Sequence, residues 1–401
     1  MERLLRRSTM KRLGIYLGFP PEGGGAFQYA QSLLAAMAAL PGNEYEVVAA
    51  HAHSAWLTIL SEYTPRIRLL TVSEGWIESS ARLALRLGFP LRLWHRIAIQ
   101  FHPLSRMLLD ERCDAWVFPA QDFLTYALPT RTIGTVHDLM HLHEPSFPEV
   151  SSRGLHRRRE NHYRNLCMHA TAILVDSQTG KDHVTKAYGE PANRVYVLPY
   201  IAPDYIRGDD PPDFDQRYAL PERFLFYPAQ FWTHKNHVRL IEAFSQARDQ
   251  ICGTHLVLAG SNKNAHTNVT RTIERLNLRD RVHLLGYVPD YDMPTLYRRA
   301  TALIMPTFFG PTNIPPLEAM AVGCPMAVSN IYSMPDQVGD AAIFFDPSSK
   351  EQIAEAIIQL ATDVDLRQRL AEAGRKRDAT WRQAQFNARF AEIIRLIYKQ
   401  T

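Results

Sequence analysis

Short apolar runs rich in β-branched residues alternate with amphipathic stretches along most of the chain, and this alternation limits the fold more than any other feature of the sequence. Buried parallel strands appear as continuous apolar runs, and helices connect them in βαβ units. In the first half the runs are RLGIYLGF, YEVVAAH, RIRLLTV, DAWVFPA, RTIGTVH, TAILVDS and RVYVLPY. In the second half they are RFLFYPA, THLVLAG, RVHLLGY, TALIMP and PMAVS, with helical patterns such as VRLIEAFSQARDQ and MPTLYRRA between them. The alternation predicts an α/β fold with two doubly wound parallel sheets.

A stretch without apolar periodicity separates the two halves. Residues 202–222, APDYIRGDDPPDFDQRYALPE, are rich in Pro and Asp, which is typical of a linker. A chain of 401 residues with 46% hydrophobic residues is long enough for two cores. We therefore expect a Rossmann-like domain over residues 1–203, a linker over 204–222, a second Rossmann-like domain over 223–381 and a closing helix over 382–401.

The closing helix is expected because apolar residues recur there at helical spacing, as Phe386, Phe390, Ile393, Ile394 and Ile397 do. Two doubly wound domains joined by one linker create a cleft. Ligands of open α/β sheets bind beyond the carboxyl ends of the strands. We therefore expect the chemistry in that cleft.

Composition excludes several classes of protein. Charged residues make up 21% of the chain and the formal net charge is only +4, which argues against bulk binding to nucleic acid. The four cysteines are far apart and show no metal spacing, which favours a reduced, cytoplasmic protein. The N-terminus lacks the pattern of a secretory signal, and no apolar stretch is long enough to span a membrane. Met10 is an alternative initiator, in which case residues 1–9 form a leader.

The first candidate site is the glycine-rich stretch GFPPEGGGAFQYAQSLLAAMAAL. It places Gly23, Gly24 and Gly25 between a strand and a helix with an apolar stripe. Backbone N–H groups in such a loop can bind an anion at the helix N-terminus. A flexible turn explains the three glycines equally well.

The second candidate site is TVHDLMHLHEPSFP, where His137 and Asp138 directly follow a strand. This position predicts a catalytic or sugar-contacting histidine at the carboxyl edge of the sheet. His141 and His143 raise a metal site as an alternative. We disfavour metal because the three histidines do not fit one face of a regular helix and no second cluster completes a zinc site. Ser177 follows another strand, where its hydroxyl either caps the next helix or touches a ligand phosphate.

The third candidate site is YPAQFWTHKNHVRLIEAF, in which Gln230, Lys235 and Asn236 lie between a strand and an amphipathic helix. A lysine there can neutralise a diphosphate as a point charge, whereas the alternative is a solvated surface lysine. We favour the functional interpretation because strand end, loop and helix start coincide.

The stretch FGPTNIPPLEAMAVGCP is the most informative. Pro311, Thr312 and Asn313 are expected to form a tight loop whose amides meet a phosphate, and Pro315 and Pro316 suit the first turn of a helix. Glu318 is then expected inside that turn. It either compensates the helix dipole, worth about 0.3–1 kcal/mol, or accepts ribose hydroxyls, worth about 1.5–3 kcal/mol per bond.

Residues 79–109 interleave five arginines with large apolar residues. The pattern is typical of an amphipathic helix pair that lies on anionic lipid. It fits equally well two helices that pack on the sheet and leave their arginines in solvent.

Taken with these motifs, the sequence resembles the retaining glycosyltransferases of family GT4, which have the GT-B fold. The resemblance runs through GGG and its helix, HDLMHLHEPSFP, YPAQFWTHKNH, PTFFGPTNIPPLEAMAVGCPMAVSN and MPDQVGDAAIFFDP. It implies two Rossmann-like domains, a nucleotide-sugar donor held mainly by the C-terminal one and an acceptor held mainly by the N-terminal one. It also implies that the closing helix crosses back to the first domain and that neither a metal nor another cofactor is required.

The resemblance also implies roles for single residues. Glu318 matches the second acid of the family's E-x7-E motif and is expected to bind the donor ribose, while Lys235 matches the diphosphate lysine. His137 matches the histidine whose backbone or ring contacts the transferred sugar. The remaining donor contacts that it implies are Gly24 and Gly25 near the phosphates, and the amides of Asn313 and Ile314.

Two positions depart from the family pattern. The first acid of E-x7-E falls on Gly310, and the arginine that usually precedes the lysine falls on Gln230. Without the first acid a double displacement with that acid as nucleophile is disfavoured, and front-face substitution with Lys235 stabilising the leaving diphosphate is expected. The missing arginine would have donated to a phosphate, and we expect Asn236, Thr312 or His234 to replace that contact.

The expected function is therefore the retaining transfer of a hexose from a nucleotide diphosphate sugar to a growing, lipid-linked surface polysaccharide or O-antigen. Mannose or a GDP-deoxyhexose is the favoured sugar, and a GDP-sugar is favoured over a UDP-sugar. Asp138 and Ser177 are expected near sugar or acceptor, and a lipid-linked acceptor would bring residues 79–109 to the inner face of the cell membrane. The alternatives are a nucleotide-sugar epimerase on the same scaffold and a non-catalytic partner in a glycan-assembly complex.

Overall fold

The computed structural model describes residues 10–20, 24–73, 75–86 and 89–400. The expected leader, residues 1–9, and Gly23 of the glycine-rich stretch lie outside these ranges. Within them, no helix combines the length and the apolar character that crossing a membrane requires.

The chain divides into two compact units. Unit 1 comprises Met1–Leu139, His156–Tyr200 and Gln383–Thr401, and unit 2 comprises Met140–Leu155 and Ile201–Arg382. The sequence pattern places residues 140–155 in the N-terminal domain, whereas in the structure they pack with unit 2. One reason is Phe147, whose ring lies 5.3 Å from that of Phe308 and 5.3 Å from that of Phe309.

Unit 1 is built on a parallel sheet of seven strands in the order β3-β2-β1-β4-β5-β6-β7. The strands are β1 (Lys11–Leu17), β2 (Tyr45–His51), β3 (Ile67–Thr71), β4 (Ala115–Phe118), β5 (Thr132–Val136), β6 (Ala172–Val175) and β7 (Val195–Val197). Each apolar run of the first half forms one of them. The order reverses between β1 and β4, so the glycine-rich stretch after β1 lies at the point where such sheets bind ligands.

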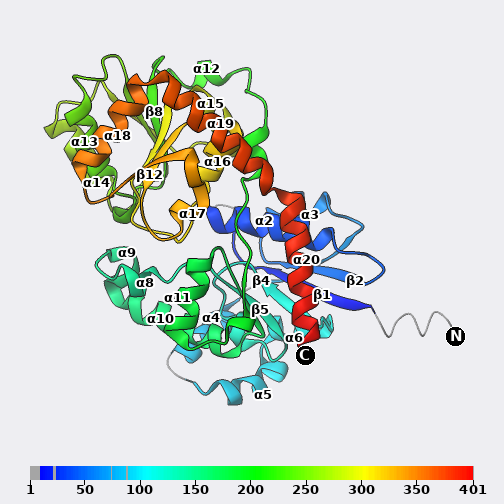
Figure 1. Ribbon diagram of the computed structural model, residues 1–401. Helices are drawn as coiled ribbons and strands as arrows, with labels where there is room; N and C mark the ends of the chain where they lie inside the picture. The colour runs from blue at the N-terminus through cyan, green and yellow to red at the C-terminus, as the bar shows by residue number, and fades with distance from the viewer. Residues whose placement is uncertain (1–9, 21–23, 74, 87–88, 401) are drawn as a thin grey trace. The chain divides into compact units, whose positions relative to one another are not determined.

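The longer helices of unit 1 are α2 (Gly25–Ala38), α3 (Trp56–Ser61), α4 (Trp76–Arg86), α5 (Leu91–Phe101), α6 (Pro103–Asp110), α10 (Leu155–His169), α11 (Gln178–Tyr188) and α20 (Gln383–Lys399), together with the short α7 (Leu124–Ala127). Helix α20 packs against α2, close to which it lies in Figure 1. Its buried side chains are the five apolar residues that predict the helix. The expectation that the closing helix returns to the N-terminal fold is therefore confirmed.

Unit 2 is built on a parallel sheet of six strands in the order β10-β9-β8-β11-β12-β13. The strands are β8 (Phe224–Pro228), β9 (His255–Ala259), β10 (Val282–Gly286), β11 (Ala302–Met305), β12 (Met326–Ser329) and β13 (Ala342–Phe345). The sequence predicts the first five, and it misses β13. That edge strand is short and mostly half-buried, so its apolar signal is weak.

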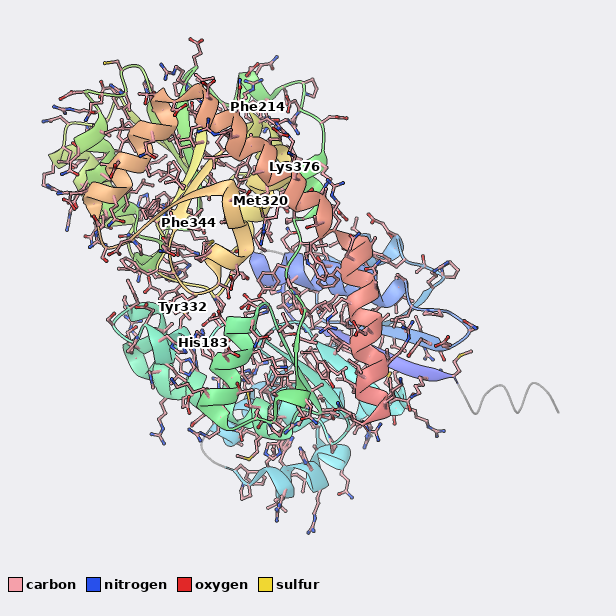
Figure 2. All side chains as sticks on the ribbon, in the orientation of Figure 1. His183, Phe214, Met320, Tyr332, Phe344 and Lys376 are labelled. Atoms are coloured by element: carbon pink, nitrogen blue, oxygen red, sulfur yellow. The ribbon has the colours of Figure 1, made fainter. Side chains whose placement is uncertain are left out.

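The helices of unit 2 begin with the short α8 (Met140–His143) and α9 (Pro148–Ser151). They continue with α12 (Phe214–Arg217), α13 (His237–Ala247), α14 (His266–Arg275), α15 (Met293–Arg299), α16 (Ile314–Val322), α17 (Met334–Val338), α18 (Lys350–Thr362) and α19 (Val364–Thr380). The core of unit 2 lies between these helices and the sheet, and it includes Phe214 of α12 and Met320 of α16 (Figure 2).

The segment expected to be a linker is ordered and packs into unit 2. It forms the 3-10 helix Asp204–Arg207 and helix α12, and it buries Ile206 and Phe214. Arg217 of α12 pairs with Asp292, which is itself buried. Sequence periodicity does not reveal this packing, because the buried residues are spaced too irregularly along the segment to mark a helix or a strand.

Candidate functional site

Two of the predicted elements meet at the carboxyl ends of β8 and β11, the neighbouring strands between which the strand order of unit 2 reverses. Lys235 ends the 3-10 turn Thr233–Lys235 after β8, and Asn313 caps α16 after β11. The Lys235 Nζ donates to Asn313 Oδ1 at 3.3 Å. The structure therefore brings the predicted lysine and the predicted loop together, beside the N-terminus of α16, where the helix dipole favours an anion.

The loop before α16 is held by Gln337, a residue that the sequence did not indicate. Its side-chain oxygen accepts from the Asn313 N–H at 2.9 Å, and its Nε2 donates to the Asn313 carbonyl at 2.6 Å. The Asn313 Nδ2 in turn donates to the Phe309 carbonyl at 3.0 Å. The Asn313 amide that we expected to meet the donor is thus occupied in this structure, whereas Ile314 is the first residue of α16 and its N–H group has no partner inside the helix.

Gly310 has a structural reason to be glycine. Its φ is +97°, and a Cβ built there would lie 2.6 Å from the Thr312 carbonyl oxygen and 2.8 Å from the Asn313 Nδ2. An acid at this position would collide with the backbone of its own loop. The missing first acid of the E-x7-E pattern and the tight turn of residues 310–313 are therefore two aspects of one loop conformation.

Glu318 is buried and bound on both oxygens. The Tyr205 hydroxyl donates to its Oε1, and the Tyr297 hydroxyl donates to its Oε2 at 2.5 Å. Burial raises the pKa of Glu318 above its ordinary value, although the two tyrosines lower it in part. The expectation that Glu318 lies in the first helical turn is wrong, because α16 begins at Ile314 and has no acid in its first turn. Dipole compensation therefore does not explain this carboxylate.

The other residues of the third stretch differ in their environment. Gln230 accepts a hydrogen bond from the Trp232 indole N–H at 2.9 Å, which orients its amide. Asn236 is buried, and its Nδ2 donates to the carbonyls of Pro306 at 3.0 Å and Pro347 at 2.8 Å. Both amide hydrogens of Asn236 are thus used to tie loops together. Thr312 is half-buried in the loop before α16.

In unit 1, His137 follows β5 as predicted and is engaged on both ring nitrogens. Its Nε2–H donates to the Pro119 carbonyl at 2.9 Å, and the Tyr200 hydroxyl donates to its Nδ1. Burial lowers the pKa of His137 below its ordinary value, against the opposing effect of the Pro119 carbonyl. The ring is therefore neutral at neutral pH and held in one tautomer, so the side chain has no nitrogen free to act as a base in this geometry.

Asp138 pairs with Arg159 of α10, and both side chains are mostly covered, with exposed fractions of 25% and 19%. The guanidinium thus neutralises the carboxylate at the edge of the sheet. Ser177 caps α11, because its Oγ accepts from the Gly180 N–H at 3.0 Å. The structure therefore supports the interpretation of Ser177 as a helix cap.

The glycine-rich stretch also forms the predicted loop and helix. Gly24 is the N-cap of α2, with φ of +60°, and Gly25 is its first residue. Because no neighbouring atom lies within 4 Å of a Cβ built on Gly24, its conformation and not a lack of space requires glycine.

The two further histidines of the second stretch lie in α8. His141 is buried, and the His143 ring lies 6.2 Å from that of Tyr332. No group of three or more His, Cys, Asp or Glu side chains suited to a metal ion occurs in the part of the chain that the structure describes.

Comparison with known proteins adds the family. Residues 212–377 match the sequence model of the family described as "Glycosyl transferases group 1". This matched region, which lies within unit 2, belongs to the group 1 glycosyltransferases. This family, GT4, consists of retaining enzymes, and the match covers the whole region that contains Lys235, the loop 309–313 and Glu318.

Two curated relatives of this glycosyltransferase carry different sugars in their names. The "O-antigen chain mannosyltransferase B" of Escherichia coli is 27% identical over 64% of this chain and 70% of its own length. The "Alpha-D-kanosaminyltransferase" of Streptomyces kanamyceticus is 24% identical over 52% of this chain and 56% of its own length. The alignment thus covers little more than half of the second relative.

Solved structures show the fold of the enzyme. Anabaena Alr3699/HepE, in its complex with UDP and glucose, superposes with a TM-score of 0.70 at 17% identity, covering 96% of this chain and 99% of that one. The expected GT-B fold, with two parallel α/β sheets and a closing helix, is therefore confirmed.

Several residues of the site escaped sequence reasoning. Each of them holds a predicted residue in place: Tyr205 and Tyr297 hold Glu318, and Gln337 holds Asn313. In unit 1, Arg159 holds Asp138 and Tyr200 holds His137. Each lies far along the chain from the residue that it holds. Only Tyr297 had a signal, since a tyrosine at a buried helical position needs a partner for its hydroxyl.

Proposed function

We propose that this glycosyltransferase transfers a hexose, with retention, from a nucleoside diphosphate sugar to a growing surface glycan. The contact between Lys235 and Asn313 carries the proposal. The ammonium group and the N-terminus of α16 lie together beyond the carboxyl ends of β8 and β11, the edge at which parallel sheets generally bind ligands, and this supports the proposal. A diphosphate is the part of a nucleotide sugar that the Lys235 ammonium group and the first-turn N–H of Ile314 would bind.

In the proposed donor site, Lys235 neutralises the diphosphate and Ile314 offers a first-turn amide. Glu318 accepts the ribose hydroxyls through the lone pairs that Tyr205 and Tyr297 leave on its oxygens. Gln230 and Thr312 lie on the two loops that flank these residues and complete the donor contacts. Asn236 acts by holding its loop.

The proposed chemistry is a front-face substitution. As the bond from the sugar to the diphosphate breaks, charge develops on the leaving oxygen, and Lys235 stabilises it. The leaving diphosphate takes the proton of the acceptor hydroxyl. Since His137 is neutral and engaged on both nitrogens, its proposed part is to shape the sugar pocket together with Asp138, and not to accept a proton. Gly24 and Gly25 are proposed to contact the donor phosphates.

A GDP-sugar, with mannose or a deoxyhexose, is the proposed donor. The name of the mannosyltransferase relative supports mannose, whereas the kanosaminyltransferase relative and the UDP complex of HepE support other donors. The acceptor that we propose is the lipid-linked end of a surface polysaccharide or O-antigen.

The membrane partner that we propose for this acceptor is an anionic lipid surface contacting α4 and α5. These helices expose large apolar side chains, with Trp76 at 78% and Phe101 at 70%. They also expose basic side chains, namely Arg86, Arg92 and Arg96. Flotation with anionic vesicles tests this surface: the protein should float with them, and Arg92→Glu with Arg96→Glu should abolish flotation. Equal flotation with zwitterionic vesicles contradicts the electrostatic part.

A thermal-shift screen tests the donor site. The purified protein is mixed, without added metal, with GDP, UDP and ADP and their common sugar conjugates. One nucleotide series should stabilise it, since a ligand at 100 times its dissociation constant adds about 2.7 kcal/mol. If no nucleotide shifts the transition, the donor site is refuted. Binding without transfer to any acceptor favours a non-catalytic partner, and donor turnover without acceptor favours an epimerase.

A further inference from the structure

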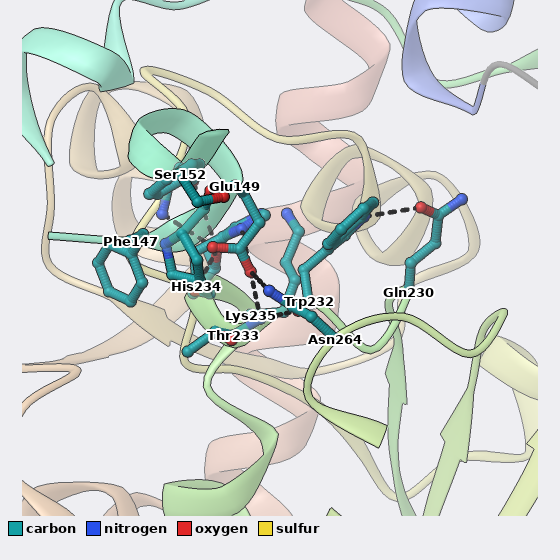
Figure 3. A network of polar contacts seen from close by, with 12 residues as sticks. Phe147, Glu149, Ser152, Gln230, Trp232, Thr233, His234, Lys235 and Asn264 are labelled. Carbon is teal, nitrogen blue, oxygen red and sulfur yellow. Dashed lines mark hydrogen bonds and ion pairs between the residues drawn. The ribbon is translucent and has the colours of Figure 1, made fainter. Parts of the chain in front are cut away.

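Glu149 binds the turn that presents Lys235. The Thr233 N–H is the first of the 3-10 turn Thr233–Lys235, so it has no partner inside the turn. It donates to Glu149 Oε1 and, at 3.1 Å, to Asn264 Oδ1 (Figure 3). The Asn264 Nδ2 donates to the same Glu149 oxygen at 3.1 Å. Glu149 and Asn264 thus fix the start of a turn whose last residue is Lys235.

The rest of the turn is held as firmly. The Tyr227 hydroxyl donates to the Lys235 carbonyl at 3.0 Å, and the Phe308 N–H donates to the His234 carbonyl at 2.9 Å. The His234 ring stacks on Phe309, with centroids 3.9 Å apart and an interplanar angle of 14°. Any displacement of the turn is therefore transmitted to Lys235 and to the loop before α16.

The charge of Glu149 is stabilised by the groups around it. Burial raises its pKa, but the neighbouring His234 ring, its own backbone and the Asn264 amide outweigh burial and lower the pKa to about 2. The carboxylate is thus ionised, 3.5 Å from His234 Nδ1, while its Oε2 is buried without a hydrogen-bond partner. Because its surroundings favour the ionised form, a neutral side chain at this position would hold the Thr233 N–H and the Asn264 amide more weakly.

Glu149 is carried by the segment Met140–Leu155, which packs with unit 2 although the chain on both sides of it belongs to unit 1. Two further contacts dock this segment: Phe147 lies against Phe308 and Phe309, and the Tyr332 hydroxyl donates to Glu144 at 2.7 Å. Glu144 lies on the same segment but contacts Tyr332 and not the lysine turn, so it offers a matched control.

We propose that Glu149 is a positioning residue for the donor diphosphate, which sets the geometry of the Thr233–Lys235 turn and thereby the position of the Lys235 ammonium group. This inference rests on the proposed function, because it assigns the diphosphate to Lys235. It predicts that changes at Glu149 alter the binding of the diphosphate and leave the binding of the nucleoside unchanged.

Calorimetric titration of the full chain with GDP, UDP, guanosine and uridine tests the proposal. Glu149→Gln should weaken binding of the preferred diphosphate about tenfold, equivalent to about 1.4 kcal/mol, while the affinity for its nucleoside stays the same. Glu144→Gln, on the same segment, should leave both affinities unchanged. In the double variant with Lys235→Ala, the loss should equal that of Lys235→Ala alone, since residues that act through one another are not additive.

Each contrary outcome is specific. An equal loss in Glu144→Gln shows that segment docking, and not Glu149, is responsible, and a loss of nucleoside affinity or an additive double variant refutes the positioning role. If Glu149→Gln does not fold, Glu149→Asp keeps the charge but shortens its reach, and it should show the same selective loss. A diphosphate loss in Lys235→Ala without one in Glu149→Gln refutes this inference alone. Unchanged binding in Lys235→Ala, or no binding by the unaltered protein, refutes the proposed donor site and this inference with it.

Discussion

Gly310 and Glu318 occupy the two acid positions of the GT4 motif, and their surroundings explain why only one acid is present. Gly310 has a backbone conformation and a contact distance that exclude a side chain. Glu318 is surrounded by two tyrosine hydroxyls that hold a buried carboxylate. A tight turn, which holds Asn313 beside Lys235, therefore stands where the motif has its first acid.

Replacing Gly310 should destabilise the protein without restoring a catalytic acid. Gly310→Ala should lower the free energy of unfolding by about 1–3 kcal/mol, because it combines a positive φ with a backbone clash. Gly253→Ala is the matched control, since Gly253 has φ of +74° but open space around a Cβ. Urea unfolding that gives equal losses for the two variants would show that the clash is relieved. Gly310→Glu should be no more active than Gly310→Ala.

Glu318→Gln should separate binding from stability. In the unaltered protein the raised pKa means that the folded state binds more protons than the unfolded state just above the ordinary pKa. The contribution of Glu318 to the free energy of unfolding is therefore greatest below the ordinary pKa. It falls as the pH rises through the raised pKa that Glu318 has in the folded state. The glutamine variant lacks this loss, so by urea unfolding it should be at least as stable at pH 7, with its advantage shrinking at acidic pH.

The same variant should bind the nucleotide more weakly, by about 1.5–3 kcal/mol for each charged hydrogen bond lost. Titration of Glu318→Gln with the preferred nucleotide measures this loss. Unchanged affinity would remove Glu318 from the donor site and leave it as a structural partner of Tyr205 and Tyr297.

At the scale of elements, helix α20 shows how a remote segment completes a fold. It packs on α2, where the Gln383 side chain donates to the Ser32 carbonyl at 3.0 Å and the Phe386 ring lies 6.1 Å from that of Tyr29. The glycine-rich loop precedes α2 directly. The closing helix therefore supports the element that begins at the proposed phosphate loop.

Phe390→Ala should destabilise unit 1, because Phe390 is fully buried on α20. A loss of about 3–5 kcal/mol is expected for a buried phenylalanine. Hydrogen exchange of the unit 1 strands measures this loss of stability separately from the stability of unit 2. The exposed Arg395 of the same helix is the control, and Arg395→Ala should change stability by no more than about 0.5 kcal/mol. Equal effects of the two variants would mean that α20 contributes little packing energy.

At the scale of the whole molecule, the two units have separate cores, and the proposed donor residues belong mostly to one of them. Hydrogen exchange of the full chain with and without GDP or UDP should show this division. Protection is expected in residues 230–239 and 307–322 of unit 2, where Lys235, the loop and Glu318 lie. Helix α20 should exchange unchanged, and protection confined to unit 1 would contradict the assignment of the donor to unit 2.

Much of this protein follows from local pattern in its sequence. The apolar runs predict twelve of the strands, and the five apolar residues of the closing segment predict the buried face of α20, because burial imposes a period on the chain wherever an element covers a core. Lys235 and the loop before α16 are also predictable, since a strand end and a helix start in succession mark the ligand edge of a parallel sheet.

The tertiary structure alone decides which residues hold these groups in place. Glu149, Asn264 and Gln337 hold the lysine turn and the loop from segments far away in the chain. Likewise Tyr205 and Tyr297 reach Glu318, and the expected linker packs into unit 2. A hydrogen bond between such distant residues leaves no periodic mark on the sequence. Its partners become neighbours only when the periodic residues pack the sheet of unit 2 and its loops come together.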